Sequence, residues 1–430
     1  MAHLLAAAAE KLPDAAAVAN QTGKAVQFQD EVKAVSFSRS TNGYYLSFGA
    51  PYPQQVLSVW LPAAVYDGLP NHKSMVGRTV RVSGNVEVSS TGALINLNSA
   101  AGLTVLAADE AILSRPALDG KQDRSQFKSA VWQTFKRGDY DLLEALGESL
   151  KRSRELLFDG SWLSEAFFDS FRMGIRQSSE QYTEMDARLN DWEKRRPVSS
   201  VLPLIRAGYH IDIAWKLRGA GYEDAVKPER RAEFQKELGA ARRILESNST
   251  TKSYREHFTL MQTIAFGQQW PRDQYERLFV EAVNVQPDYY EFFCHKAQYL
   301  SPLGTGKRGE WEEFAERERQ KAGAGAGGDA LYARIAWSMR NFYKNVFKES
   351  DVSWPKVASG WQYLIRQYPS SNYLKSIYAN LCWKVGDRER LRAALPLIGP
   401  NPDMTVWVNL ENVNLAQKFA DGVEAVDAER

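Results

Sequence analysis

Residues 42–60 read NGYYLSFGAPYPQQVLSVW and carry five aromatic rings in nineteen positions. The stretch predicts two strands, near 43–49 and 55–61, each with one face rich in leucine. Successive side chains in a strand point to opposite faces of the sheet. If the leucine-rich faces are interior, Tyr45 and Trp60 point outward together.

The stretch belongs to a longer run, from about 25 to 107, in which apolar and polar residues alternate. Such a period near two is typical of β-strands, and Gly- and Asn-containing turns separate the segments. We predict strands near 31–38, 43–49, 55–61, 78–88 and 93–97, with a short final one at 103–106. Five short strands favour a small closed barrel, because an open sheet would need its edges covered.

The segment PAAVYDGLPNHKSMVG, between the third and fourth strands, predicts a short helix. Three strands, a helix and two strands is the order of the OB-fold. The sequence resembles small bacterial OB-type domains at Leu46-x-Phe48-Gly49, at the Tyr52-Pro53 loop and at Gly77-x-x-Val80-x-Val82-x-Gly84. This resemblance covers about a fifth of the chain. It implies an OB-like five-stranded β-barrel.

Beyond Asp123 the apolar period changes to 3.6, and Pro or Gly breaks separate successive helices. One junction recurs: Lys136-x-Gly138-Asp139-x-Asp141-x-Leu143-x-Ala145 matches Lys384-x-Gly386-Asp387-x-Glu389-x-Leu391-x-Ala393. We predict that each glycine takes a left-handed helix cap and that each aspartate caps the next helix. The segment 354–395 looks like tetratricopeptide-type (TPR) helix pairs. No strict period runs through the middle, so the repeats are degenerate.

The middle of the chain resembles an uncharacterised bacterial family of TPR-like helical proteins. The matching residues are Ala214-Trp215-x-x-Arg218-Gly219-x-Gly221 and the stretch from Leu300-Ser301-Pro302 to Trp311-Glu312-Glu313-Phe314-Ala315. The tryptophan-glycine pair expected just after Pro302 is absent here. The resemblance implies a helical fold and carries no known activity.

These patterns predict an α+β multidomain protein. Its predicted parts are an N-terminal helix (1–24), an OB-like β-barrel (25–108), a linker (109–123), an irregular TPR-like α-solenoid (124–420) and a tail (421–430).

The composition excludes some classes of protein. The 54 basic and 52 acidic residues give a net charge of +2, too balanced to indicate nucleic-acid or membrane binding by bulk electrostatics. The apolar neighbours of Cys294 and Cys382 predict two buried thiols rather than a disulfide. No run of 18 apolar residues occurs, so we expect no membrane span. The N-terminus lacks a basic segment, which predicts a cytoplasmic protein, or a periplasmic one if a signal has been removed.

No catalytic motif is recognisable. The five histidines form no HxH or HExxH spacing, and no GxSxG occurs. The glycine stretch at 303–308 departs from the P-loop pattern, and the one at 323–328 follows no strand. We therefore predict no catalytic residues, no metal site and no cofactor.

Binding candidates come from the predicted barrel: Tyr45, Tyr52, Trp60, Arg78 and Arg81. Outward rings in an OB-fold can stack on nucleobases or sugars. Residues 1–110 carry seven basic and eight acidic side chains, so the positive groove of a single-strand binder is missing. This favours rings that pack against the helical half.

The leading hypothesis is a non-catalytic protein–protein interaction or assembly scaffold that grips a protein or peptide partner on the concave surface of the solenoid. The alternative is single-stranded nucleic-acid or sugar binding through the barrel, with the helical domain recruiting partners. A third is an enzyme whose site is assembled from scattered residues.

Overall fold

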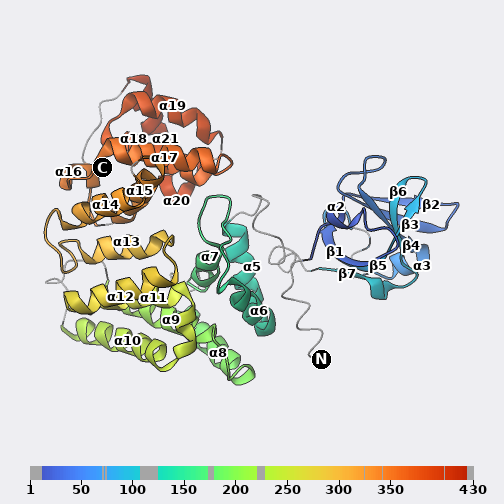
Figure 1. The fold of residues 1–430 in the computed structure, drawn as a ribbon, viewed down its shortest axis with the longest axis horizontal. Helices are drawn as coiled ribbons and strands as arrows, with labels where there is room; N and C mark the ends of the chain where they lie inside the picture. The colour runs from blue at the N-terminus through green and yellow to red at the C-terminus, as the bar shows by residue number, and fades with distance from the viewer. Residues whose placement is uncertain are drawn as a thin grey trace. The chain divides into compact units, whose positions relative to one another are not determined.

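A computed structural model describes residues 12–69, 72, 75–106, 124–172, 179–219, 228–323, 325–340, 342–400 and 402–423, with only the backbone described at 179–181. The protein is α+β, with an N-terminal mixed sheet and a helical C-terminal region (Figure 1). It forms two compact units: Met1–Pro116 with Ser125–Leu146, and Ala117–Arg124 with Gly147–Arg430. The predicted linker, 109–123, lies outside the described residues. So do residues 1–11 of the predicted N-terminal helix and most of the tail.

The first unit contains a seven-stranded mixed sheet. Its strands are β1 (Ala25–Glu31), β2 (Ala34–Ser38), β3 (Gly43–Phe48), β4 (Leu57–Pro62), β5 (Thr79–Ser89), β6 (Gly92–Asn96) and β7 (Leu103–Val105). The hydrogen-bonded order is β1-β5-β6-β4-β3-β2, and β7 pairs with β5. The pairs are antiparallel except for β4 and β6, which are parallel.

The prediction of a closed five-stranded barrel is wrong. The sheet has seven strands and is open, with β1 and β2 at the two ends of its path. The strand predicted near 31–38 is two strands, interrupted at Val32 and Lys33. The amide of Val32 donates to Arg78, beside β5, whereas the amide of Lys33 donates to Ser47 on β3. The chain therefore changes partner strands at this bend, which an alternating pattern alone does not reveal.

The leucine-rich face of the sheet forms the core of the first unit. Leu46 and Phe48 of β3 are fully buried, so the predicted assignment of faces is confirmed. Phe28 of β1 meets Phe48 edge-on at 5.2 Å between ring centroids. Two short helices, α2 (Ala15–Val18) and α3 (Ala63–Asp67), add Val18 and Tyr66 to the same core. The helix α3 lies where the sequence predicts one.

Helices form the rest of the described chain. The longer ones are α5 (Arg124–Arg137), α6 (Tyr140–Leu150), α7 (Leu163–Ser170), α8 (Ser179–Arg195), α9 (Leu202–Arg218), α10 (Pro228–Ser247), α11 (Arg255–Gly267), α12 (Arg272–Val285), α13 (Tyr290–Tyr299), α14 (Glu310–Lys321), α15 (Ala326–Met339), α17 (Trp354–Gln367), α18 (Asn372–Val385), α19 (Arg388–Ile398) and α21 (Leu410–Asp421). Short helical pieces are η2 (Ala100–Gly102), η5 (Ser249–Ser253), α16 (Val346–Glu349) and α20 (Met404–Trp407).

Within the second unit the helices pack as consecutive pairs. The pairs are α9 with α10, α11 with α12, α13 with α14, α15 with α17 and α18 with α19. Figure 1 shows them stacked in chain order from α10 to α19. The first helices of successive pairs also touch one another, α9 with α11, α11 with α13 and α13 with α15. They therefore share one face, which we call the first-helix face.

The prediction of two buried thiols is confirmed. Cys294 and Cys382 are free thiols, and both are buried. Across the described residues, the helices are all too short or too polar to cross a membrane.

The repeated Gly-Asp junction ends one helix and begins the next in the same way at both positions. Gly138 and Gly386 have φ angles of 73° and 80°, in the left-handed region. At the second junction the amide of Gly386 donates to Trp383, and the amide of Asp387 donates to Cys382. The first junction repeats both bonds, to residues at the same spacing. This is the Schellman arrangement, in which glycine avoids the strain of a Cβ.

The first prediction concerns this cap. Gly386→Val should destabilise the protein by roughly 1–2 kcal/mol, because a β-branched residue is strained in the left-handed region. Gly386→Asn is the matched control, since asparagine tolerates that region, and should retain most of the stability. Urea unfolding measures both changes. A valine variant as stable as the wild type would contradict the cap assignment.

Candidate functional site

The structure brings Tyr45 and Trp60 together. They are directly opposite each other in the β3–β4 register, and both are partly buried. The indole N–H of Trp60 donates to Thr41 Oγ1 at 3.1 Å. A Cβ added to Gly43 would lie 2.4 Å from Trp60 Nε1, so the indole lies directly on that glycine. The ring of Trp60 is therefore fixed by packing within its own unit.

The other sequence-predicted binding residues lie elsewhere on the sheet. Tyr52 is 63% exposed in the loop between β3 and β4. Arg81 is opposite Gln29 in the β1–β5 register, and its guanidinium donates to the side chain of Gln29 at 3.3 Å. Arg78 directly precedes β5. Since β6 separates β5 from β4, the two arginines and the two rings lie on different strand pairs.

The neighbour of Trp60 on the next strand is not a cation. Asn96 of β6 is in register with Trp60, and its side-chain amide donates to Glu87 at 2.7 Å. The charged group that Asn96 binds is thus a carboxylate, which cannot provide the phosphate contacts that dominate nucleic-acid affinity.

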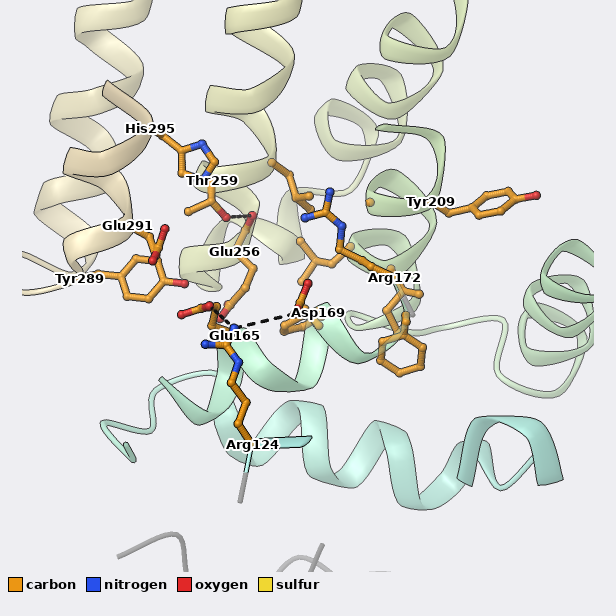
Figure 2. Close-up of a pocket in the computed structure, with 16 residues that line it drawn as sticks. Arg124, Glu165, Asp169, Arg172, Tyr209, Glu256, Thr259, Tyr289, Glu291 and His295 are labelled. Carbon is orange, nitrogen blue, oxygen red and sulfur yellow. Dashed lines mark hydrogen bonds and ion pairs between the residues drawn. The ribbon is translucent and has the colours of Figure 1, made fainter. Parts of the chain in front are cut away.

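The described part of the second unit holds a pocket of about 180 Å³ on the first-helix face. Figure 2 shows its side chains converging from several helices. The lining residues come from the start of α5, from α7 and the residues just after it, and from α9, α11 and α13: Arg124, Glu165, Phe168, Asp169, Phe171, Arg172, Leu204, Ile205, Gly208, Tyr209, Glu256, Thr259, Leu260, Tyr289, Glu291 and His295.

One side of the pocket is an ion-pair network around Arg124. Its guanidinium donates to Glu165 at 2.7 Å and lies 3.8 Å from Asp169 (Figure 2). Glu165 and Asp169 are four residues apart on α7, so they occupy the same face of that helix. The hydroxyl of Tyr290 also donates to Glu165, at 3.4 Å.

A second arginine of the pocket, Arg172, pairs with Asp212, a residue that does not line the pocket. Arg172, just after α7, donates through Nε to both carboxylate oxygens of Asp212 at 2.9 Å, and Nη2 bonds Asp212 as well. Such fork-shaped pairs are the strongest form of the arginine–carboxylate interaction. Arg172 is therefore anchored on α9.

Glu256 is the most deeply buried carboxylate of the pocket, at 4% exposure. Within the described chain, its Oε1 has no hydrogen-bond donor. The guanidinium of Arg255 approaches Oε1 only to 3.9 Å. Burial raises the pKa of Glu256, and Arg255 and the nearby hydroxyl of Ser164 lower it only in part. The first turn of α11 thus places in the pocket a carboxylate oxygen that has an ion-pair neighbour but no hydrogen bond.

Glu291 is the second carboxyl group of the pocket whose pKa is raised. Burial, with the nearby charge of Glu165, raises the pKa of Glu291 to about 8, against the opposing influence of Arg334 and Arg124. At neutral pH the group is therefore mostly protonated in the folded protein. His295, one helical turn later, has its pKa lowered to about 4 by burial and then by Arg172, so it is neutral.

The site offers carboxyl groups and a neutral imidazole. Among the described residues, no three His, Cys, Asp or Glu side chains are placed to hold a metal ion. The arrangement can accept hydrogen bonds, hold a cation or exchange a proton at Glu291.

Sequence reasoning missed the pocket, whose residues are spread from Arg124 to His295. A usable signal is present in α7, α9, α11 and α13, where pocket residues recur at spacing i, i+4 among apolar neighbours. Examples are Glu165 and Asp169, Ile205 and Tyr209, Glu256 and Leu260, and Glu291 and His295.

Comparison of the chain with protein-family models, with curated proteins and with solved structures gives no match. The fold and the pocket are therefore interpreted from their own geometry.

The second prediction uses the raised pKa of Glu291. The folded protein keeps a proton that the unfolded chain releases, so the stabilising contribution is present at low pH and is lost as pH rises from about 4.5 to 8. Glu291→Gln cannot ionise. It should be close to wild type in stability near pH 4.5 and more stable near pH 9, by roughly 1–3 kcal/mol.

Urea unfolding at several pH values measures this difference. The exposed Glu313→Gln is the control and should follow the wild-type curve. Parallel curves for wild type and Glu291→Gln would show that Glu291 titrates alike in both states, against the prediction.

Proposed function

We propose that the protein is a non-catalytic interaction protein whose helical unit holds a segment of a partner protein on the first-helix face. The observation that carries the proposal is the position of the pocket, which takes residues from α9, α11 and α13, the first helices of three successive pairs. Stacked helix pairs create extended surfaces that are used for binding peptides and proteins. In this proposal the pairs form an irregular TPR-like α-solenoid.

Arg334 extends the first-helix face to a fourth helix, α15. Its guanidinium lies 4.1 Å from the ring centroid of Tyr290 and donates to the carbonyl of Gly160 at 3.3 Å. Residues from α13 and α15 therefore adjoin the pocket along the stack. A segment bound along this face would contact several pairs at once, as an extended peptide does.

For the N-terminal unit we propose an OB-type connectivity. The strand that bends at Val32 and the parallel pairing of β4 with β6 support it. The indole of Trp60, which packs within its own unit, favours a structural role for the outward rings. The same packing argues against the alternative of nucleic-acid binding through this face.

The third prediction tests the interaction surface with a residue that lines the pocket but makes no polar contact. A Cβ at Gly208 would lie 3.8 Å from Leu260, so α9 has room for a side chain there. Gly208→Leu should fill the pocket and reduce binding of peptides selected from a displayed library by tenfold or more. Gly208→Ala is the matched control and should keep that binding.

Both variants replace a helical glycine, so each should be at least as stable as the wild type, with alanine gaining about 1 kcal/mol. Loss of peptide binding in the leucine variant therefore reports on the pocket and not on unfolding. Selected peptides that bind Gly208→Leu as tightly as the wild type would place the binding surface elsewhere and contradict the proposal.

A further inference from the structure

The pocket contains a buried carboxylate oxygen that the described chain does not satisfy. Glu256 is 4% exposed, and its Oε1 finds no donor among the residues that the structure places. The nearest approach of Arg255, 3.9 Å, is longer than a hydrogen bond. Burying an unsatisfied acceptor is unfavourable, so this oxygen favours a ligand that supplies a donor, above all a charged one.

Arg255 itself is held in another direction. Its Nη2 donates to the carbonyl groups of Leu150 and Ser153. Its guanidinium also lies over two rings, 4.5 Å from the centroid of Trp162 and 5.5 Å from that of Tyr289. These contacts hold the guanidinium at ion-pair distance from Glu256 without a hydrogen bond to Oε1, and its Nη1 has no hydrogen-bond partner among the described residues.

The two arginines that line the pocket are bound by other carboxylates. Arg124 is bound by Glu165 and Asp169, and Arg172 is bound by Asp212. The charges of Arg124 and Arg172 are thus offset by these carboxylates, and neither arginine neutralises Glu256.

Glu291 provides a second acceptor in the same pocket. The charged or titratable groups that act on it are Glu165 of α7, Arg124 of α5, Arg334 of α15 and the adjacent Tyr290. The acidic neighbour and burial outweigh the two arginines, since the pKa of Glu291 is raised to about 8. A cation bound beside it would favour the ionised form and release a proton.

The remaining wall is apolar and suits an alkyl chain. It consists of Phe168, Phe171, Leu204, Ile205 and Leu260. Lysine and arginine side chains combine an apolar stem with a charged end, and they bury the stem against apolar surface.

We propose that this pocket receives a basic side chain of the partner segment, with its guanidinium or ammonium group at Glu256 and Glu291 and its alkyl stem against the apolar wall. This inference rests on the proposed function and specifies the chemistry of the partner. A guanidinium is the better match, because its several donors can reach two carboxyl groups at once.

The test is isothermal titration calorimetry on the full-length protein. The probes are an acetylated and amidated Gly-Arg-Gly peptide, the same peptide with neutral citrulline, and butylguanidinium as the free cation. The arginine peptide should bind most tightly, and the citrulline peptide roughly 10–100-fold more weakly. Affinity for arginine should rise from pH 6.5 to pH 9, because the guanidinium stays charged while Glu291 ionises.

Glu256→Gln and Glu291→Gln should each weaken the arginine peptide by tenfold or more, with urea unfolding as the check that both fold. Glu291→Gln should also remove the pH dependence, which a loss of packing alone would not do. Equal binding of arginine and citrulline, or unchanged affinity in both variants, would overturn the proposal. If butylguanidinium binds and the arginine peptide does not, the pocket takes a free cation, and the proposal of a basic side chain from a partner segment is wrong.

The two proposals can fail separately. If library peptides sensitive to Gly208→Leu contain no basic residue, the interaction surface stands and the cation pocket is wrong. If Gly208→Leu leaves library binding intact while the arginine peptide requires Glu256, the pocket binds cations but is not the partner surface.

Discussion

The buried guanidinium of Arg255 is the interaction on which the centre of the helical unit depends. Arg255 is 2% exposed at the start of α11. It joins three separate segments, through the carbonyl groups of Leu150 and Ser153 at the end of α6, the ring of Trp162 before α7 and the ring of Tyr289 before α13. An isolated charge would be very unfavourable there, so these carbonyl and ring contacts are needed to hold it.

The same arrangement explains the chemistry of the pocket. Consecutive residues of α11 cannot both point the same way, so Arg255 packs toward Trp162 while Glu256 lines the pocket. The arginine is then too far from its neighbour to form a hydrogen bond with it. Arg124, bound by Glu165 and Asp169, closes another side of the site. The carboxyl groups of Glu256 and Glu291 line it from α11 and α13.

The sequence predicts much of the fold because its periodicity changes sharply. Alternation places Leu46 in the core and Trp60 on the other face, and the spacing of Gly386 and Asp387 identifies a helix junction. The bend at Val32 escaped prediction because it changes hydrogen-bond partners without disturbing the alternation. The closed barrel was inferred from the number of short strands and from the resemblance to OB-type domains, and neither determines which strands pair.

The pocket could not be predicted because its chemistry depends on contacts between helices. Glu256 and Glu291 look like ordinary polar residues near helix starts, where acids are common. Only packing shows that Glu256 is buried and that Arg255 turns away from it. The signal in the sequence is a pair of charged residues, Arg255 and Glu256, at the start of an otherwise apolar helix.

The most direct test of this account is an experimental crystal structure of the full-length protein grown with butylguanidinium at pH 9. The account predicts a guanidinium nitrogen within hydrogen-bond distance of Glu256 Oε1, with Arg255 still between Trp162 and Tyr289. If Arg255 instead donates a hydrogen bond to Glu256, that carboxylate is already satisfied and the central claim is wrong. A ligand that lies outside the pocket would contradict the claim as well.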